Sequence, residues 1–243
     1  TSHTSALIVV NTRKAARELY NRLSGRKYHL STYMTKLDRN RIFSQVKEAL
    51  RQGEPFVLVS TSLIEAGVDL DFEAVFRERA GIDNILQTAG RCNREGKRDS
   101  EKSRKYVFDF KEEDLRTKDK HMLTKQYVCT EVMRDFGTSD KAIRAYFDKI
   151  FTYGKETMSE YDFVKFITPT GFKFASYAEK FKLIDDAGHS VIVLYPDDAA
   201  QKDIIAELAQ DGRKAKRKLQ QYTVSLREYE FKKLSEQGII SQR

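Results

Sequence analysis

The chain has 243 residues, of which 40% are hydrophobic and 33% are charged, so it can bury a core beneath a strongly charged surface. This composition excludes wholesale disorder, and no apolar run approaches the roughly 18 residues of a membrane-spanning helix. Its 44 lysines and arginines exceed its 36 acidic residues and give a net charge of +8. That excess favours a polyanion partner such as nucleic acid, although basic enzymes without such a partner also exist.

The cysteines and histidines indicate neither a disulfide framework nor a metal centre. There are two cysteines, Cys92 and Cys129, and the four histidines are scattered without metal-ligand spacing. The first residues lack a signal peptide's basic and apolar segments, and they lack an initiator methionine. We therefore expect a cytoplasmic protein without bound metal, whose sequence is either trimmed or cut from a longer chain.

The first part of the chain, to about residue 110, alternates apolar runs with amphipathic segments. The apolar runs predict strands at 6–10, 28–32, 56–60, 74–76 and 106–108. Periodic apolar residues predict a helix capped by Thr12, a second from Asp38 to Gly53, and a third from about Asp83. Continuous apolar strands that alternate with helices indicate an α/β fold, with a parallel sheet covered by helices on both faces.

The rest of the chain is predicted to form two further parts. Residues 113–150 carry apolar side chains at helical intervals, broken at Gly137, and indicate a helical linker. Residues 151–243 mix strand and helix signals and indicate a smaller α+β domain. Its strands are expected near 172–174, 191–195 and 222–226, and its helices over 203–221 and 228–237. The expected domains are therefore 1–112, 113–150 and 151–243.

Residues 56–69 contain the first candidate site. Ser60 and Thr61 end a strand, so their hydroxyl and N–H groups lie at the carboxyl edge of the sheet, where α/β proteins bind ligands. Such groups suit a phosphate backbone. Gly67 permits a close turn beside a ligand, and Asp69 can accept a hydrogen bond from a ribose hydroxyl. An ordinary strand, a capping threonine and a glycine turn explain these residues equally well.

Residues 87–94 contain the second candidate site. Arg91 and Arg94 are three residues apart, so we expect both guanidiniums, with Gln87, on one helical face. Two aligned guanidiniums can stabilise the charge that develops on a transferring γ-phosphoryl group. A solvated basic helix end is the alternative for an isolated Arg-x-x-Arg pair. The preceding motif at this distance favours the functional interpretation.

These stretches resemble a known family. Residues 61–69 are similar to motif five, and residues 87–94 to motif six, of superfamily two helicases. Gly-Arg-Cys-Asn-Arg at 90–94, followed by Glu-Gly, resembles the CRISPR-associated helicase-nuclease that Cascade recruits to degrade foreign DNA. Residues 11–13 match the position of motif four, and residues 30–34 with Arg39 resemble the adjoining motif. Softer similarity at 178–184 and 221–225 extends the resemblance to that family's terminal domain.

The resemblance implies a second RecA-like lobe and a C-terminal domain of an ATP-dependent single-stranded DNA helicase that feeds a nuclease. Arg91 and Arg94 would then reach the γ-phosphate with support from Gln87, while Gly67 and Asp69 would face the nucleotide. It further implies a set of DNA-binding residues: Asn11, Thr12, Arg13, Arg39, Ser60 and Thr61. The implied partners are single-stranded DNA, the Cascade surveillance complex, and the preceding RecA-like lobe and nuclease domain of the same protein.

Three motifs that the complete family requires do not occur in this sequence. It contains no Gly-x-x-x-x-Gly-Lys-Ser/Thr, no Asp-Glu dipeptide and no His-Asp dipeptide. We expect ATP and magnesium to act in a complete protein whose magnesium ligands lie outside this chain, and neither to be bound by this chain alone. The alternative is a separately produced nucleic-acid-binding or assembly module without motor activity.

Three other features carry less weight. The aromatic residues between 146 and 181 alternate with lysines, which is typical of a base-stacking surface but more often of a packed core. The basic run at 213–218 indicates either a phosphate-tracking surface or a solvated helix face. Cys92 is expected to be a small packed residue, because no histidine lies nearby to activate it.

Overall fold

The computed structural model describes residues 4–65, 69–94, 96, 103–158, 167–168, 171–172, 188–208 and 212–240. By its internal contacts the chain divides into two compact units, residues 1–119 with 188–243 and residues 120–187. The three-part division at residues 112 and 150 stays a prediction, because grouping by contacts does not test which segments fold independently. Among the described ranges, no helix has both the length and the apolar content needed to cross a membrane.

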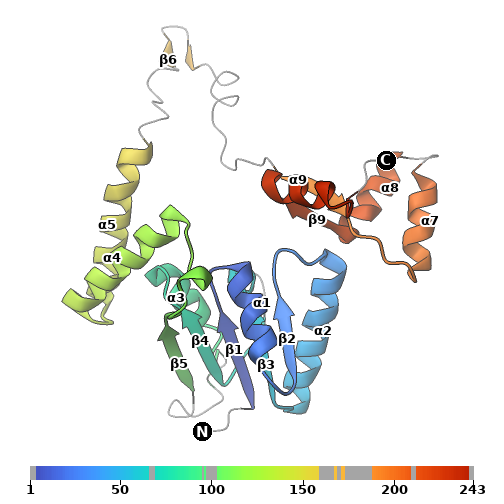
Figure 1. Cartoon of the computed structure of the whole chain (residues 1–243). Helices are drawn as coiled ribbons and strands as arrows, with labels where there is room; N and C mark the ends of the chain where they lie inside the picture. The colour runs from blue at the N-terminus through green and yellow to red at the C-terminus, as the bar shows by residue number, and fades with distance from the viewer. Residues whose placement is uncertain are drawn as a thin grey trace. The chain divides into compact units, whose positions relative to one another are not determined.

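A five-stranded parallel sheet forms the centre of the first unit (Figure 1). Its strands lie in the order β2-β3-β1-β4-β5, and every neighbouring pair is parallel. The strands are β1 Ser5–Val9, β2 Lys27–Leu30, β3 Phe56–Ser60, β4 Ala74–Glu78 and β5 Arg104–Phe108. The predicted α/β fold class is confirmed, and each of the five predicted strands is present within a few residues of its expected position.

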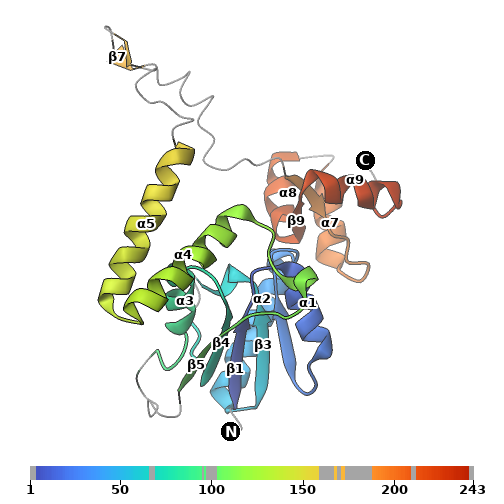
Figure 2. The ribbon, with the colours of Figure 1, turned by 60° about the vertical axis from the view of Figure 1, so that its left-hand side comes forward.

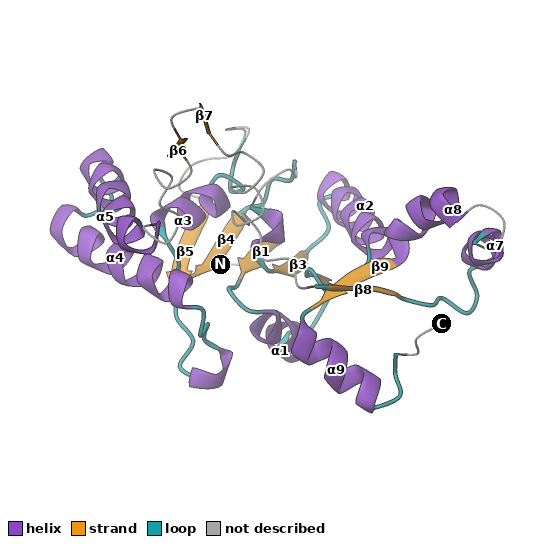
Figure 3. Ribbon diagram, turned by 90° about the horizontal axis from the view of Figure 1, so that it is seen from above, coloured by secondary structure: helices purple, strands orange, loops and turns teal. Residues whose placement is uncertain are grey.

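Helices cover both faces of this sheet, as the apolar strands predicted. The helices are α1 Arg13–Arg22, α2 Lys36–Gln52 and α3 Ile82–Ala89. Leu7 and Val9 of β1 share a core with Val46 of α2, whereas the intervening Ile8 packs with Ala15 and Ala16 of α1. Figure 3 shows α1 and α2 on opposite sides of the sheet. Alternate residues of one strand therefore enter two different cores.

The helix ends follow from their capping residues. The Thr12 hydroxyl accepts the N–H of Ala15 at 3.0 Å, which caps α1 as predicted. Gly53 ends α2 with φ of +67°, a backbone conformation that favours glycine. The beginning of α2 was predicted too late, because Thr35 rather than Asp38 caps it, and the Thr35 hydroxyl accepts the Asp38 N–H at 3.2 Å.

The second unit is described by its two long helices and one short hairpin. These are α4 Lys120–Phe136, α5 Asp140–Met158, and the antiparallel pair β6 Ile167–Thr168 with β7 Gly171–Phe172. Figure 2 shows α4 and α5 as a helical hairpin. Gly137, with φ of +62°, separates the two helices as predicted.

The expectation of a core for the aromatic stretch holds only in part. Tyr146 is fully buried, but Phe147 is 37% and Phe151 is 67% exposed. The expectation is therefore wrong for these two phenylalanines, because they lie on the side of α5 that the described residues leave uncovered. Most of the stretch beyond residue 153 lies outside the residues whose side chains are described.

Residues 188–240 form a small α+β layer within the first unit. Its elements are β8 His189–Ile192, α7 Ala199–Glu207, α8 Gly212–Leu219, β9 Thr223–Leu226 and α9 Glu228–Glu236. β8 and β9 pair in antiparallel fashion, and β9 and α9 lie where they were predicted.

Two expectations for this layer are wrong. A single helix over 203–221 is replaced by α7 and α8, because Leu208 ends the first helix and Gly212, a poor helix former, begins the second. The strand expected over 191–195 ends at Ile192, because the side chain of Gln201 accepts the Tyr195 N–H at 2.7 Å and donates to the Val193 carbonyl.

The layer is attached to the beginning of α2. Leu37 packs against a core of Ile204, Ala215, Leu219 and Tyr222. The Tyr195 hydroxyl hydrogen-bonds the Thr35 hydroxyl at 2.8 Å and donates to the Asp38 carboxylate. Ala215 and Leu219 face inward, and the exposed side chains of the basic run cover the outer side of α8, in agreement with a solvated helix face.

The attachment predicts a measurable effect of one hydroxyl. Replacing Tyr195→Phe removes the bonds to Thr35 and Asp38, and we expect the free energy of unfolding to fall by about 1 kcal/mol. Urea denaturation followed by circular dichroism measures the change. Tyr106→Phe is the control, because that ring stacks on Phe76 with centroids 4.7 Å apart. Equal losses in the two variants would contradict the role of the Tyr195 hydroxyl.

Candidate functional site

The carboxyl ends of the central strands bring the candidate motifs to one edge of the sheet. Val9 at the end of β1 lies beside Ser60 of β3 and Arg77 of β4. The segments that follow these strands, including residues 11–13 and 60–65, therefore lie close together. This edge is where open α/β sheets bind their ligands.

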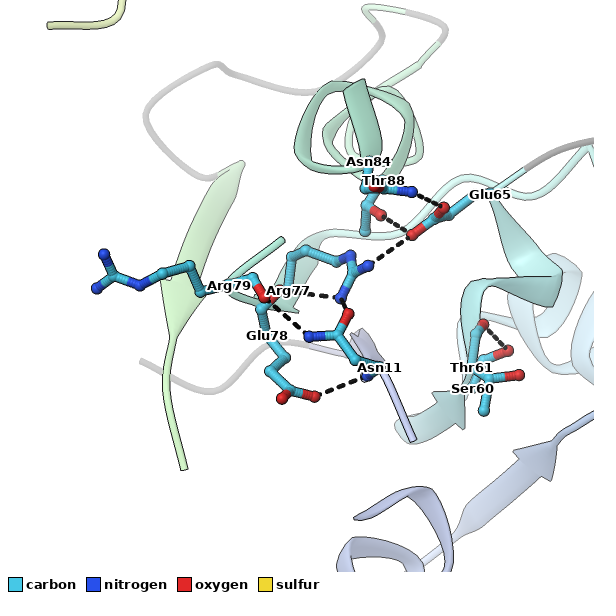
Figure 4. A network of polar contacts seen from close by, with 9 residues as sticks. All are labelled: Asn11, Ser60, Thr61, Glu65, Arg77, Glu78, Arg79, Asn84 and Thr88. Carbon is cyan, nitrogen blue, oxygen red and sulfur yellow. Dashed lines mark hydrogen bonds and ion pairs between the residues drawn. The ribbon is translucent and has the colours of Figure 1, made fainter. Parts of the chain in front are cut away.

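A buried ion pair between Glu65 and Arg77 joins these segments (Figure 4). The guanidinium lies 3.0 Å from the carboxylate, and the two side chains are only 2% and 5% exposed. Glu65 also accepts hydrogen bonds from Asn84 at 2.8 Å and from Thr88 at 3.4 Å, both in α3. Such additional bonds are needed to offset the cost of removing two charges from water. The pair thereby ties the segment after β3 to β4 and to α3.

The network continues from Arg77 to the segment after β1. Arg77 Nη1 donates to the Asn11 side-chain oxygen at 2.7 Å, and the Asn11 amide donates to the Arg79 carbonyl at 2.8 Å. The Asn11 N–H donates to the Glu78 carboxylate at 2.7 Å. Figure 4 shows these contacts converging on Asn11. The side chain of Asn11 thus holds its own segment against β4.

Burial governs the titration of both charged residues of β4. It lowers the pKa of Arg77, while the neighbouring Glu65 acts in the opposite direction. Burial also raises the pKa of Glu78, and hydrogen bonding by Asn11 opposes that rise. The carboxylates of Glu65 and Glu78 therefore oppose the lowering of the Arg77 pKa by burial.

The expectation that Arg91 and Arg94 project from one helical face is wrong. α3 ends at Ala89, and the chain beyond it bonds to Phe72, whose N–H donates to the Arg91 carbonyl at 2.8 Å. The Asn93 N–H in turn donates to the Phe72 carbonyl at 3.2 Å. The segment between the two arginines is a turn in which Asn93 has a left-handed backbone with φ of +53°, so helical spacing does not apply to them.

The two arginines instead occupy different environments. Arg91 is buried, and its Nη2 donates to the Glu65 carbonyl at 2.9 Å. The Arg94 side chain is 46% exposed and pairs with Asp69 at 2.9 Å. Burial lowers the pKa of Arg91, and repulsion by Arg94 adds to the effect whereas Asp69 opposes it. These three residues therefore form one electrostatic cluster.

The other predicted nucleotide residues are less well defined. Gln87 is exposed near the end of α3, directly before the turn that carries the two arginines. Gly67 lies outside the described residues. The Asp69 side chain is 84% exposed and pairs with Arg94.

The predicted DNA-binding hydroxyls lie at the ends of β3 and β1. Ser60 and Thr61 are buried, and the Ser60 hydroxyl donates to the Thr61 carbonyl at 2.8 Å. The Thr61 hydroxyl is buried and has no hydrogen-bond partner among the described residues. The Thr12 hydroxyl donates to the Leu115 carbonyl at 3.1 Å and also caps α1. The Ser60 and Thr12 hydroxyls are engaged within the protein, so of these three the Thr61 hydroxyl is the one that can hydrogen-bond a ligand.

The two predicted DNA-binding arginines lie near the beginnings of α1 and α2, which cover opposite faces of the sheet. The Arg13 guanidinium lies over the Tyr33 ring, 3.5 Å from its centroid, and pairs with Glu230 of α9 at 3.2 Å. Arg39 is half-buried near the beginning of α2. These placements are compatible with a DNA contact for either residue and test neither.

Sequence reasoning missed the roles of Glu65 and Arg77. Glu65 lies inside the motif-five stretch, where no function was assigned to it, and Arg77 follows the expected strand 74–76. The available signal was Arg77 itself, a charged residue directly after an apolar run of a central parallel strand. Such a residue is buried only if it has a partner.

Among the described residues, the remaining reactive side chains form no separate centre. In the part of the chain that the structure describes, no group of three or more histidine, cysteine or acidic residues could hold a metal ion. Cys92 is buried, and its Sγ donates to the Glu73 carbonyl at 3.3 Å. It is thus a small packed residue, as predicted.

Comparison with known proteins agrees with these motifs. Residues 2–97 match the family model described as CRISPR-associated nuclease/helicase Cas3, C-terminal. The crystal structure of T. fusca Cas3 aligns with a TM-score of 0.59 at 16% identity, over 92% of this chain and 32% of that one. A second crystal structure, of a CRISPR-associated protein, gives 0.59 at 17% identity, over 93% and 32%. At such identities the likeness shows the fold.

Curated relatives match shorter regions at higher identity. The CRISPR-associated nuclease/helicase Cas3 of Haloferax volcanii is 53% identical over 55 residues, which are 22% of this chain and 6% of that protein. The CRISPR-associated helicase Cas3 of Thermoproteus tenax is 30% identical over 105 residues, 42% of this chain and 18% of that protein. The matched region thus covers less than a fifth of either relative.

The parallel sheet therefore shares its fold with these crystal structures, and the motif-five stretch begins at the carboxyl end of β3. Residues 2–97, which contain the candidate motifs, are similar to the C-terminal part of the CRISPR-associated nuclease/helicase Cas3, the family that the motifs predicted.

The buried pair gives a prediction for stability. Arg77→Met leaves the Glu65 carboxylate buried without its partner, and we expect a loss of about 3–5 kcal/mol in the free energy of unfolding. The double variant Glu65→Gln with Arg77→Met should lose less, because no unpaired charge remains. Urea denaturation measures both. Arg51→Met breaks an exposed pair with Glu48 and should change the free energy of unfolding far less than Arg77→Met. A double variant as unstable as Arg77→Met would contradict this account.

Proposed function

We propose that this chain is the second RecA-like lobe and C-terminal domain of an ATP-dependent single-stranded DNA helicase. In this proposal the complete protein unwinds foreign DNA and feeds it to its own nuclease domain during type I CRISPR interference. The observation that carries the proposal is the cluster of Arg91, Arg94 and Asp69, which is anchored through the Glu65 carbonyl. Its arginines occupy the two arginine positions of motif six.

The cluster suits one wall of a nucleotide site. We assign Arg94 to the charge that develops on the γ-phosphate, because its guanidinium is half exposed and pairs with the exposed Asp69. Arg91, which is buried against Glu65, holds the segment and adds positive potential. Gln87 would support Arg94 from α3, and Asp69 with Gly67 would contact the ribose side.

The chemical donors present fit ATP but not its metal. Two guanidiniums suit a triphosphate, whereas the described residues include no cluster of three side chains able to hold a metal ion. Bound ATP would supply the free energy of movement when it is hydrolysed. We therefore place the magnesium ligands and the phosphate cradle on a preceding RecA-like lobe of the same protein.

The DNA would bind along the carboxyl edge of the sheet. We assign the phosphate contacts to Thr61, whose buried hydroxyl has no partner among the described residues, and to Arg13 and Arg39. Ser60 and Thr12 would contribute backbone groups, since their hydroxyls are engaged internally. Asn11 would act by positioning, because its side chain is committed to Arg77 and Arg79. The Cascade surveillance complex is the partner we propose for delivery of the DNA.

The proposed role of Arg94 gives a kinetic prediction. In the complete helicase-nuclease, Arg94→Ala should still bind ATP but lose DNA-stimulated hydrolysis by about a thousandfold, the lower range for removal of an arginine finger. A phosphate-release assay with single-stranded DNA measures the rate, and Arg213→Ala on the exposed side of α8 is the charge-matched control. Undiminished turnover in Arg94→Ala would contradict the assignment.

Because this chain would supply only one wall of the nucleotide site, here called the half-site, it gives a prediction for the chain alone. The 243-residue chain should hydrolyse no ATP, because phosphoryl transfer requires the metal and phosphate cradle as well as the arginine. Its net charge of +8 should still give weak, sequence-independent binding to single-stranded DNA that falls steeply with salt. Phosphate release and fluorescence anisotropy at low and physiological salt measure these properties. Hydrolysis by the chain alone would contradict the half-site, and salt-insensitive binding would contradict the electrostatic account.

A further inference from the structure

A basic pocket lies between the beginning of α1, the end of β2 and the beginning of α9. Its volume is about 480 Å³, within the range of small-ligand sites. α1 supplies Arg13, Lys14 and Arg17 to the lining, and α9 supplies Glu230. His29 also lines it, and the buried His29 Nε2 has no hydrogen-bond partner among the described residues. The lining therefore has three permanent cations and a single carboxylate.

That carboxylate is held directly on Arg13. Glu230 Oε1 lies 3.2 Å from Arg13 Nη2, and their side chains are 14% and 26% exposed. The opposite face of the guanidinium is covered by the Tyr33 ring, 3.5 Å away at its centroid. Arg13 is thus stacked on one side and neutralised at its edge, as an arginine is when it binds a phosphate.

Glu230 is fixed in this position by its own helix. Its Oε2 accepts the Arg227 N–H at 2.9 Å, which is the capping contact of α9, and its Oε1 accepts the Tyr229 hydroxyl at 3.0 Å. Burial lowers the pKa of Arg13, and Glu230 is the main group that opposes this effect. The carboxylate is therefore a built counter-ion for Arg13.

We propose that α9 is an anionic gate on the DNA path, in which the Glu230 carboxylate occupies the place on Arg13 that a DNA phosphate takes. The inference rests on the proposed function, which assigns Arg13 to single-stranded DNA. A phosphodiester entering the pocket competes with Glu230 for the guanidinium, and its other oxygens reach Lys14 or Arg17. Binding of DNA then releases α9 from α1, so that the contact between the C-terminal layer and α1 depends on whether DNA occupies the pocket.

The test compares two acidic residues of the same helix. Glu230→Gln removes the charge but keeps an acceptor for the Arg227 N–H, because glutamine serves equally at this capping position. Glu228→Gln changes the net charge by the same amount, but the Glu228 carboxylate pairs with His189 and with Lys232 instead. Fluorescence anisotropy with a labelled oligothymidine measures the affinity of the 243-residue chain at fixed salt.

We expect Glu230→Gln to bind the oligonucleotide about fivefold more tightly than the unmodified chain, the effect of one nearby charge in water. Glu228→Gln should change the affinity much less. The gain should vanish when Arg13→Ala is combined with Glu230→Gln. Equal gains for the two glutamine variants, or a gain that persists without Arg13, would overturn the gate.

A second readout is independent of DNA. Modification of Arg13 by phenylglyoxal, followed by peptide mass spectrometry, should be faster in Glu230→Gln than in the unmodified chain or in Glu228→Gln. An unchanged rate would overturn the gate whatever the DNA affinities. If no variant binds DNA, the proposed function fails at this step, and the modification rates alone decide whether Glu230 covers Arg13.

Discussion

The buried ion pair between Glu65 and Arg77 is the constraint on which the candidate site depends. Both charges are almost fully removed from solvent, so each must keep its partner, and the hydrogen bonds around them fix three chain segments at once. The segment after β3, the strand β4 and the helix α3 meet at this pair. The Glu65 carbonyl then holds Arg91, which positions the chain that carries Arg94. A structural contact thereby sets the geometry of a surface that we propose to act on ATP.

A second polar contact joins the C-terminal layer to the same lobe at another place. Arg13 of α1 and Glu230 of α9 are far apart in sequence but form a partly buried pair, and Tyr195 adds a neutral link to the beginning of α2. The buried Glu65–Arg77 pair is inaccessible to ligands, whereas the Arg13–Glu230 pair lines a pocket. The first pair is therefore suited to rigidity, and the second is suited to exchange with an incoming phosphate.

Much of the fold could be predicted from local sequence, because apolar runs and capping residues determine strands and helix ends. Thr12 and Gly53 are examples in which the residue type alone fixed a boundary. The sequence could not show that α3 stops at Ala89, since this depends on Phe72 pairing with the chain around Arg91. Nor could it show the partner of Arg77, because ion pairs between distant segments follow from the strand order. Spacing along one helix was therefore misleading for Arg91 and Arg94.

The most direct test of this account is a structure of the complete helicase-nuclease with a non-hydrolysable ATP analogue and single-stranded DNA. We predict that the Arg94 guanidinium leaves Asp69 and lies within hydrogen-bond distance of the terminal phosphate. The Glu65–Arg77 pair and the Arg91 contact to the Glu65 carbonyl should be unchanged in that complex. An Arg94 that points away from the nucleotide, or a bound state in which the Glu65–Arg77 pair is open, would contradict the account.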